Sequence, residues 1–242
     1  MIKFHNERKY TSMFKKVLSV AKRVLIYLVG LLIIAVGINL SKMAGLGISP
    51  VSSVPRALEV ISNGRFTLGT MVIVIYCVLV LAQLLVLRKK FKIWNVLGVP
   101  VAIVFGWMVD FTGIDPKAIG HLMLNFPRPQ NYVMSLVYLL VSMVVIGIGV
   151  FVYLRPNLVP MPAEGLAKAI SEVSGKPFGD CKTFVDTGLI LIALILQLIF
   201  LGGFASFTGP NVVVREGTIL AALCVGQIVK FIAKLFKKKA AK

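Results

Sequence analysis

The chain has 242 residues, of which 58% are hydrophobic and only 15% charged, and its formal net charge is +18. Soluble domains carry about 25% charged residues, so this composition excludes an ordinary soluble domain. A net charge of this size in a soluble protein would indicate nucleic-acid binding. Here the basic residues lie next to long apolar runs, which is typical of membrane topology signals and lipid-headgroup contacts. We therefore exclude nucleic acid as a partner.

Six apolar runs are long enough to cross a bilayer as helices, which takes about 20 residues each. In chain order the runs are Val24–Leu40, Met71–Leu87, Ile93–Val109, Tyr132–Leu154, Gly188–Phe204 and Gly217–Ala233. They are continuous rather than alternating, which excludes the strands of a membrane barrel. The predicted fold is an all-α integral membrane protein with six transmembrane helices. The first run is too long for a signal-peptide core, so we expect it to be retained as a span.

The two halves of the chain resemble each other. At a constant offset of 112 residues, Leu46 falls on Leu158 and Pro50 on Pro162, and at an offset of 120 Gly106 falls on Gly226. Each copy holds three predicted spans. An odd number of spans gives the copies opposite orientations, and such inverted repeats are common in secondary transporters.

The charge distribution predicts the orientation of the chain in the membrane. With both ends inside, 21 Lys and Arg residues lie on the inner side and six on the outer side, as the positive-inside rule requires. The predicted organisation is a basic cytoplasmic segment (1–23), a first three-span repeat (24–113), an extracytoplasmic link (114–131), a second three-span repeat (132–233) and a basic cytoplasmic tail (234–242). Both basic ends are expected to contact the anionic inner leaflet.

A short helix is predicted after the first span of each repeat. Ser49 and Pro50 fit an N-cap and a first helical position in the first copy, and in the second copy Pro162 fits the first position with Glu164 in the first turn. About 10 helical residues cannot cross a bilayer of about 30 Å. Each helix therefore lies at the interface or enters the membrane as a re-entrant half-helix. In the second case the two N-termini would form an anion or substrate site near the midplane.

Ionisable residues in or beside membrane spans are functional candidates. Asp186, at the start of the fifth predicted span with Thr183 and Thr187 nearby, is the leading candidate for a proton- or cation-coupling carboxylate; the alternative is a headgroup-level carboxylate paired with Lys182. Asp110, at the outer end of the third span, is a second candidate, and an interfacial role is its alternative.

Polar amides inside the spans are candidates for a substrate or ion pathway, and they are Gln83, Gln197 and Asn39. Hydrogen bonds between helices are the alternative role. Arg56 and Lys168 occupy equivalent positions on the two short helices. They are candidates for binding an anionic substrate or a lipid phosphate, and snorkelling to the interface is the alternative.

Motifs for catalysis or metal binding are missing from the sequence. It contains no phosphate loop, zinc motif or nucleophile elbow, and its three cysteines and two histidines lack metal-site spacing. We expect no enzymatic activity, no cofactor and no bound metal.

Three stretches of this sequence resemble the YczE/YyaS/YitT family of bacterial membrane proteins. They are Gly45–Pro50 (Gly-Leu-Gly-Ile-Ser-Pro), Gly165–Ile170 together with Gly175–Gly179, and Glu216–Leu223. The resemblance is closest to the YczE branch, because no soluble domain follows the last span. It implies a multi-pass protein of the bacterial plasma membrane and supplies no catalytic residues. Lys168 and Met161 depart from the small or apolar residues expected there.

Two functions are compatible with these patterns. The first is a small secondary transporter or permease of an unknown substrate, for which the short-helix N-termini favour an organic anion. The second is a non-transporting membrane protein that assists or regulates a membrane-associated enzyme. The expected partners are the bilayer and a small-molecule substrate, and self-association into a homo-oligomer stays open.

Overall fold

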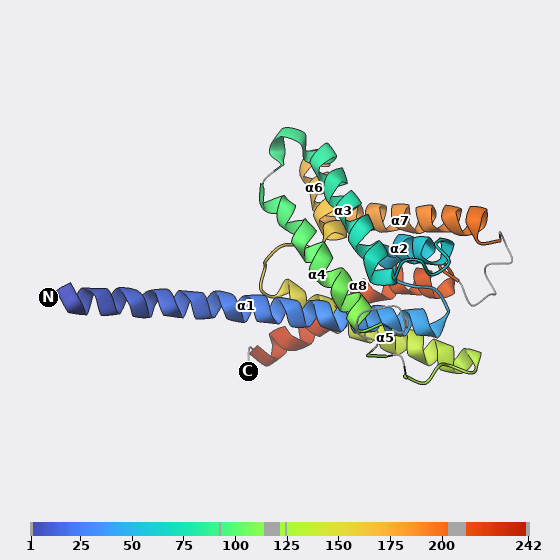
Figure 1. Ribbon diagram of the computed structural model, residues 1–242, viewed down its shortest axis with the longest axis horizontal. Coiled ribbons are helices and arrows are strands. Elements are labelled where there is room, and N and C mark those ends of the chain that lie inside the picture. Colours follow the sequence, from blue (N-terminus) through green and yellow to red (C-terminus); the bar gives the residue numbers. More distant parts are fainter. Residues whose placement is uncertain (1, 92, 114–121, 124, 203–211, 241–242) are drawn as a thin grey trace.

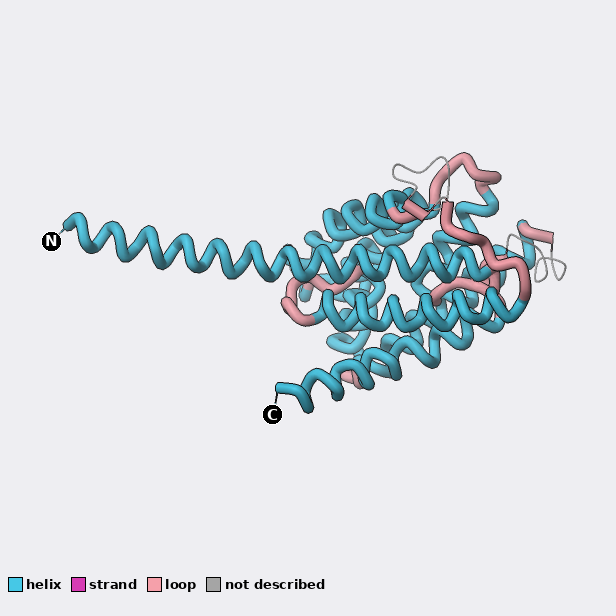
Figure 2. The backbone as a smooth tube through the Cα atoms, turned by 90° about the horizontal axis from the view of Figure 1, so that it is seen from below, coloured by secondary structure: helices cyan, strands magenta, loops and turns pink. Residues whose placement is uncertain are grey.

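A computed structural model describes residues 2–91, 93–113, 122–123, 125–202 and 212–240, and the side chains of residues 2–16 and 236–240 fall outside this description. Within it every regular element is a helix (Figures 1 and 2). The elements are α1 (Ile2–Ala44), α2 (Pro50–Ile61), α3 (Leu68–Leu87), η1 (Arg88–Lys90), η2 (Ile93–Leu97), α4 (Gly98–Phe111), α5 (Tyr132–Leu154), α6 (Pro162–Ser174), α7 (Phe178–Phe200) and α8 (Glu216–Ala240).

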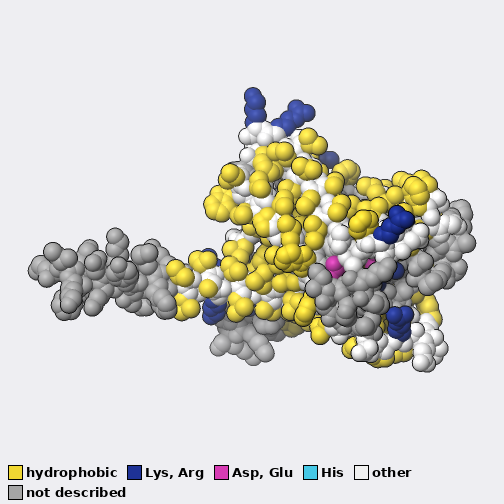
Figure 3. All heavy atoms as spheres, viewed as in Figure 1, with side chains coloured by type: hydrophobic (Ala, Val, Ile, Leu, Met, Phe, Trp, Pro, Cys, Tyr) yellow, Lys and Arg dark blue, Asp and Glu magenta, His cyan; other side chains and the backbone are white. Residues whose placement is uncertain are grey.

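Six helical segments are long and apolar enough to cross a membrane: Val17–Ala44, Leu68–Lys90, Ile93–Phe111, Tyr132–Leu154, Phe178–Phe200 and Glu216–Leu235. The prediction of an all-α protein with six such helices is confirmed. Figure 3 shows hydrophobic side chains covering the visible face over α1, α3 and α4, with Lys and Arg at the turn that joins α3 to α4. The chain is a multi-pass membrane protein.

The fifth span begins ten residues earlier than its hydropathy predicts, at Phe178 instead of Gly188. The polar segment between these residues continues the helix because Lys182 and Asp186, one turn apart, form an ion pair on its surface. Asp186 therefore lies in the third turn of α7 and not at its start. Most of the link 114–131, and the side chains of both basic ends, lie outside the described residues.

Both chain ends emerge on one side of the bundle, which we call the terminal face; the other end of the bundle is the opposite face (Figures 1 and 2). Helix α1 has 43 residues, and at 1.5 Å per residue it is roughly 65 Å long. This length exceeds the hydrocarbon core of about 30 Å, and α1 projects far beyond the bundle on the terminal face.

Helices α1 and α5 are antiparallel and cross in backbone contact at three glycines. A Cβ atom on Gly30 would lie 2.5 Å from the backbone nitrogen of Tyr153, and one on Gly149 would lie 2.8 Å from that of Ile34. A Cβ on Gly37 would meet the Ile146 side chain at 2.5 Å. Small residues allow such close approach between membrane helices. Because of this pairing, the end of α5 lies toward the terminal face, and its start lies beside the end of α1.

The short helices α2 and α6 are packed among the long ones. Helix α2 contacts α3, α7 and α8, and α6 contacts α3, α4 and α7. Ser49 is the N-cap of α2 with Pro50 in its first turn, as predicted, although the Ser49 hydroxyl makes its hydrogen bond to the Ser52 hydroxyl (3.2 Å). Pro162 begins α6. Since α2 and α6 have 12 and 13 residues, neither can span the bilayer.

Candidate functional site

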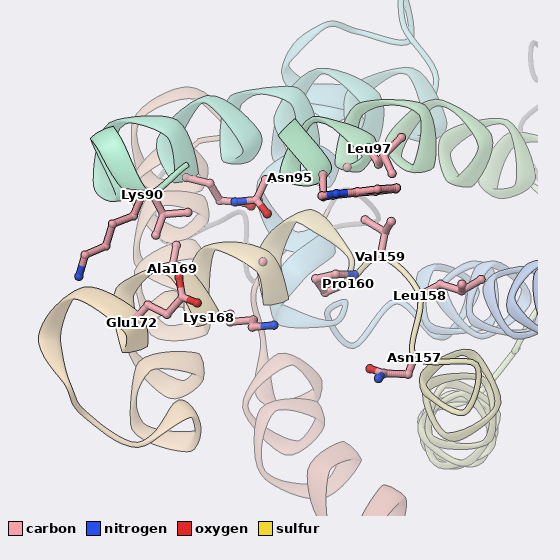
Figure 4. Close-up of a pocket in the computed structure, with 15 residues that line it drawn as sticks. Lys90, Asn95, Leu97, Asn157, Leu158, Val159, Pro160, Lys168, Ala169 and Glu172 are labelled. Atoms are coloured by element: carbon pink, nitrogen blue, oxygen red, sulfur yellow. The ribbon is translucent and has the colours of Figure 1, made fainter. Parts of the chain in front are cut away.

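A cavity of about 460 Å³ opens between the α3–α4 connection and the segment that leads into α6. One wall comes from the end of α3, η2 and the start of α4. The facing wall comes from residues 157–160 and from α6 (Figure 4). Its polar lining residues are Gln83, Lys90, Asn95, Asn157, Lys168 and Glu172. Because residues 157–160 follow the end of α5, the cavity lies toward the terminal face.

Gln83 and Gly165 join the two walls of this cavity at its floor. The buried Gln83 side chain donates a hydrogen bond from Nε2 to the carbonyl of Pro162 at 3.0 Å. A Cβ atom on Gly165 would lie 2.8 Å from Gln83 Oε1, so glycine is the residue that lets α6 approach α3 this closely. The Oε1 atom accepts no hydrogen bond from a described residue.

The side chains around the cavity favour an anionic ligand. Lys90 and Lys168 supply two cations and Glu172 one carboxylate, and Asn95 and Asn157 supply amide donors. Lys168 is exposed and forms no ion pair with a described residue. A lysine is a compact point charge with three donors, which suits carboxylates and phosphates. In Figure 4, Asn95 lies on one wall and Lys168 on the other.

A smaller cavity of about 150 Å³ shares the 157–160 segment and Lys168 with the first cavity as lining. It is lined by Tyr153, Glu164 and Lys168 among others. The Tyr153 hydroxyl is buried and has no hydrogen-bond partner among the described residues, whereas the Tyr27 hydroxyl donates to the carbonyl of Val159 at 2.8 Å. Glu164, in the first turn of α6 as predicted, is half-buried and makes no ion pair with a described residue.

Asp186 is engaged in an ion pair within α7. Lys182 Nζ donates to both of its carboxylate oxygens, at 2.5 and 2.6 Å. Thr183 is exposed and donates to the carbonyl of Gly179 at 3.1 Å, and Thr187 is also exposed. None of these residues lines either of the two cavities described above. The structure therefore shows the pairing that the sequence offered as the alternative for Asp186.

At the opposite face, Gln197 binds the loop that precedes α8. Its Oε1 accepts hydrogen bonds from the backbone nitrogens of Val213 (3.2 Å) and Val214 (2.7 Å). This loop is closed against the end of α1, because Gly217 N donates to the carbonyl of Leu46 at 2.9 Å. The structure thus holds Gln83 and Gln197, which the sequence predicts to be roughly equivalent, in different surroundings.

Asn39 and Asp110 tie α4 to its neighbours near the opposite face. Asn39 Nδ2 donates to the carbonyl of Val109 and to the Thr112 hydroxyl, both at 2.9 Å. Asp110 accepts from the Thr67 hydroxyl (2.6 Å) and from Gly69 N (2.8 Å). Both side chains are buried and fully engaged in joining α4 to α1 and α3.

Arg56 belongs to a buried charge cluster. Glu59 pairs with Arg56 at 2.6 Å and with Lys42 at 2.5 Å, and the Glu59 side chain is 5% exposed. Sequence reasoning missed Glu59 and Lys42. Their signal was the spacing of Arg56 and Glu59, three residues apart on a short helix, together with a basic residue at the end of the first span. Arg56 is neutralised here, whereas Lys168, which the sequence predicts to be its equivalent, lines a cavity.

Replacing Gln197 by leucine is expected to loosen the opposite face. The change leaves two buried backbone N–H groups without an acceptor, and an unsatisfied buried group costs about 1–3 kcal/mol. The matched control is Gln83→Leu, which removes a single donor to Pro162. We expect the lower melting temperature and the faster proteolysis near residues 212–216 in Gln197→Leu. Equal effects of the two changes would contradict the importance of the Gln197 contacts.

Comparisons with known proteins place the chain in a family. Residues 21–234 match the model of a family of unknown function, DUF6198, and the chain belongs to this family. It is similar to a protein of Bacillus subtilis (strain 168) described as "Uncharacterized protein YyaS". The two are 26% identical over 201 residues, which cover 83% of this chain and 86% of that protein. No solved structure matches the chain.

Proposed function

We propose that this member of the DUF6198 family is a small secondary transporter of an organic anion, built from two inverted three-span repeats. The observation that carries the proposal is a difference between the two ends of the bundle. Segments that are equivalent in the two repeats are separated by a cavity at the terminal face and joined by hydrogen bonds at the opposite face. A transporter with alternating access opens in this way to one side at a time.

The difference can be followed at single positions. Leu46 and Leu158 are equivalent at the offset of 112, and Gly217 and Leu97 at the offset of 120. The first members of these pairs meet, through the bond from Gly217 N to the Leu46 carbonyl. The second members, Leu158 and Leu97, both line the 460 Å³ cavity and are 39% and 37% exposed, whereas Leu46 is 3% exposed.

The packing of the helices supports the repeat. Helix α1 packs on α5, and α2 packs on α7 as α6 packs on α3. Helix α1 also contacts α4, as α5 contacts α8. Exchanging the two halves of the chain maps the α1–α5 pair onto itself and each of the other pairs onto another pair in the set. The α3–α4 contact of the first half has no strong equivalent between α7 and α8 in the described part of the chain.

The chemistry of the cavity supports an anion as the substrate. Its two lysines outnumber its single carboxylate, and three amide side chains offer further donors. With the orientation expected from the basic segments, the cavity faces the cytoplasm of a bacterial cell. In this proposal the protein performs no covalent chemistry and needs no cofactor, and its partners are the anion and the anionic lipids of the inner leaflet.

The proposal is tested by cysteine labelling in proteoliposomes. Cys77, Cys181 and Cys224 are first replaced by alanine, and then Leu158→Cys and the buried control Leu46→Cys are made separately. At rest, a membrane-impermeant maleimide is expected to label Leu158→Cys from the terminal face and to leave Leu46→Cys unmodified. Uptake of radiolabelled mono- and dicarboxylates and of phosphate is measured in the same vesicles.

The expected result is uptake of at least one of these anions, with Leu158→Cys protected and Leu46→Cys exposed during uptake. Lys168→Gln should weaken the uptake at least tenfold, whereas Lys176→Gln, in the exposed turn after α6, should not. Folded protein that moves none of these anions, with labelling unchanged by all of them, would contradict the proposal.

A second function, a non-transporting partner of a membrane enzyme, is favoured by a different observation. Asp186, Gln83 and Gln197 all have hydrogen-bond partners inside the protein. Internal hydrogen bonds of this kind are what a rigid scaffold requires. Static labelling at both cysteine positions, without anion uptake, is the result that would favour this function.

A further inference from the structure

Where α6 packs against α7, Glu164 of α6 lies within electrostatic range of the ion pair between Lys182 and Asp186 of α7. Lys182 is bound to Asp186, at 2.5 and 2.6 Å, and it acts electrostatically on Glu164 as well. With all three groups ionised, these three residues, which we call the acid cluster, carry one net negative charge. The further cation that lines the small cavity, Lys168, is exposed to solvent. An uncompensated charge in a partly buried place is costly. One bound proton would remove it.

Glu164 is the member of the acid cluster that has no counter-ion of its own. It lines the 150 Å³ cavity and makes no hydrogen bond or ion pair with a described residue. The Tyr153 hydroxyl, buried and without a partner, lines the same cavity. Buried polar groups normally have partners, and ordered water supplies them where protein does not. A cavity of this volume has room for several waters of about 30 Å³ each, which would connect Glu164 to the Tyr153 hydroxyl.

We propose that Glu164 is a proton-binding site of this protein, which exchanges its proton through the small cavity and shares the charge of Lys182 with Asp186. If the protein transports anions as proposed above, this proton is the coupling ion. The proton site itself does not depend on transport. The sequence had pointed to Asp186 for this role, but the ion pair with Lys182 neutralises Asp186 and leaves Glu164 as the group that takes up a proton.

The groups around Glu164 favour a proton over a metal cation. The α1, α3 and α5 helices present Tyr27, Tyr76 and Tyr153, which are neutral, and α7 presents Lys182 and Asp186. On α6 itself, Lys168 lines the same cavity. Lys168 and Lys182 would repel a metal cation. The Glu164 carboxylate and the Tyr153 hydroxyl also supply fewer oxygen ligands than metal ions require.

The electrostatics of Glu164 agree with this role. Burial, and secondarily the charge of Asp186, raise the pKa of Glu164 from 4.5 to about 7, and Lys182 opposes the rise. Glu164 lies on α6, which does not span the bilayer. With this pKa, its carboxyl group would exchange a proton with solvent near neutral pH. Since the folded protein holds this proton more tightly than the unfolded chain does, the contribution of Glu164 to stability is complete below pH 4.5. This contribution is lost as the pH rises toward 7 and above.

The test is infrared difference spectroscopy of purified protein in lipid vesicles, titrated from pH 5 to 9. We expect a protonated-carboxyl band that disappears with a midpoint near 7. Glu164→Gln should remove this band. Glu172→Gln, on the exposed side of the same helix, is the matched control and should keep it.

Asp186→Asn tests whether the midpoint of the band depends on the charge of Asp186, which it would not if Glu164 had a purely structural role. The change removes one carboxylate and frees Lys182 to pair with Glu164, so the midpoint should fall by at least one pH unit. A band that survives in Glu164→Gln, or a midpoint unchanged in Asp186→Asn, would overturn the proposal. If Glu164 titrates in vesicles that take up none of the anions, the result supports the proton site and contradicts the proposed transport.

Discussion

Replacing Gly30 by alanine is expected to loosen the packing of α1 against α5 and to lower the melting temperature of the protein. The new Cβ atom would lie 2.5 Å from the backbone nitrogen of Tyr153 and 2.7 Å from its Cα atom. Backbone atoms cannot rotate away, so the helices must separate along their crossing. Overpacking of this kind costs about 1–3 kcal/mol in well-packed cores, and here it also disrupts the longest helix contact of the fold.

The measurement is the melting temperature of purified protein in detergent, followed by size-exclusion chromatography after heating. Gly226→Ala in α8 is the matched control, because a Cβ atom there meets nothing within 4 Å. It should melt at or above the wild-type temperature, since alanine favours helix over glycine. Equal melting temperatures of Gly30→Ala and Gly226→Ala would contradict the close backbone contact between α1 and α5.

A second large loss of stability is expected for Glu59→Gln. The carboxylate of Glu59 pairs with Lys42 and Arg56, whose side chains are 8% and 14% exposed. Removing one partner of a buried ion pair costs about 3–5 kcal/mol, because a buried charge loses its compensation. The melting temperature of Glu59→Gln in detergent should therefore fall by many degrees.

The control for Glu59→Gln is Glu172→Gln, which removes an exposed carboxylate and should leave the melting temperature nearly unchanged. The double variant Glu59→Gln with Arg56→Gln should recover part of the loss, because it removes one of the two cations as well. A Glu59→Gln protein as stable as Glu172→Gln would show that the cluster is solvated in the membrane-bound protein.

Much of the fold was predictable, because hydropathy and turn residues are local signals. Six spans follow from apolar runs, and Pro50 and Pro162 mark the starts of the short helices because proline fits a first helical turn. The early start of α7 was missed, since hydropathy counts Lys182 and Asp186 as polar although their pairing lets the helix continue. The expected orientation of the spans in the membrane rests on the distribution of Lys and Arg in the sequence.

The candidate site was less predictable, because it depends on contacts between distant segments. The large cavity forms where Asn95 and Leu97 face Asn157 and Leu158, and no local pattern relates these positions. Glu59 was overlooked because its partner Lys42 lies 17 residues earlier, on another helix. Glu164 was recognised as a helix-start residue. Its lack of a counter-ion became visible only once Lys182 was seen to pair with Asp186.

The crossing of α1 and α5 limits how the two halves of the protein can move. Gly30, Gly37 and Gly149 lock the helices at one axial register, and sliding either helix by one turn would bring larger side chains against a neighbouring backbone. Translation along the crossing is therefore blocked, whereas a change of angle about it is not. We therefore expect any relative motion of the two halves to be a tilt about this pair and not a slide along it, and a tilt would widen one face of the bundle while narrowing the other.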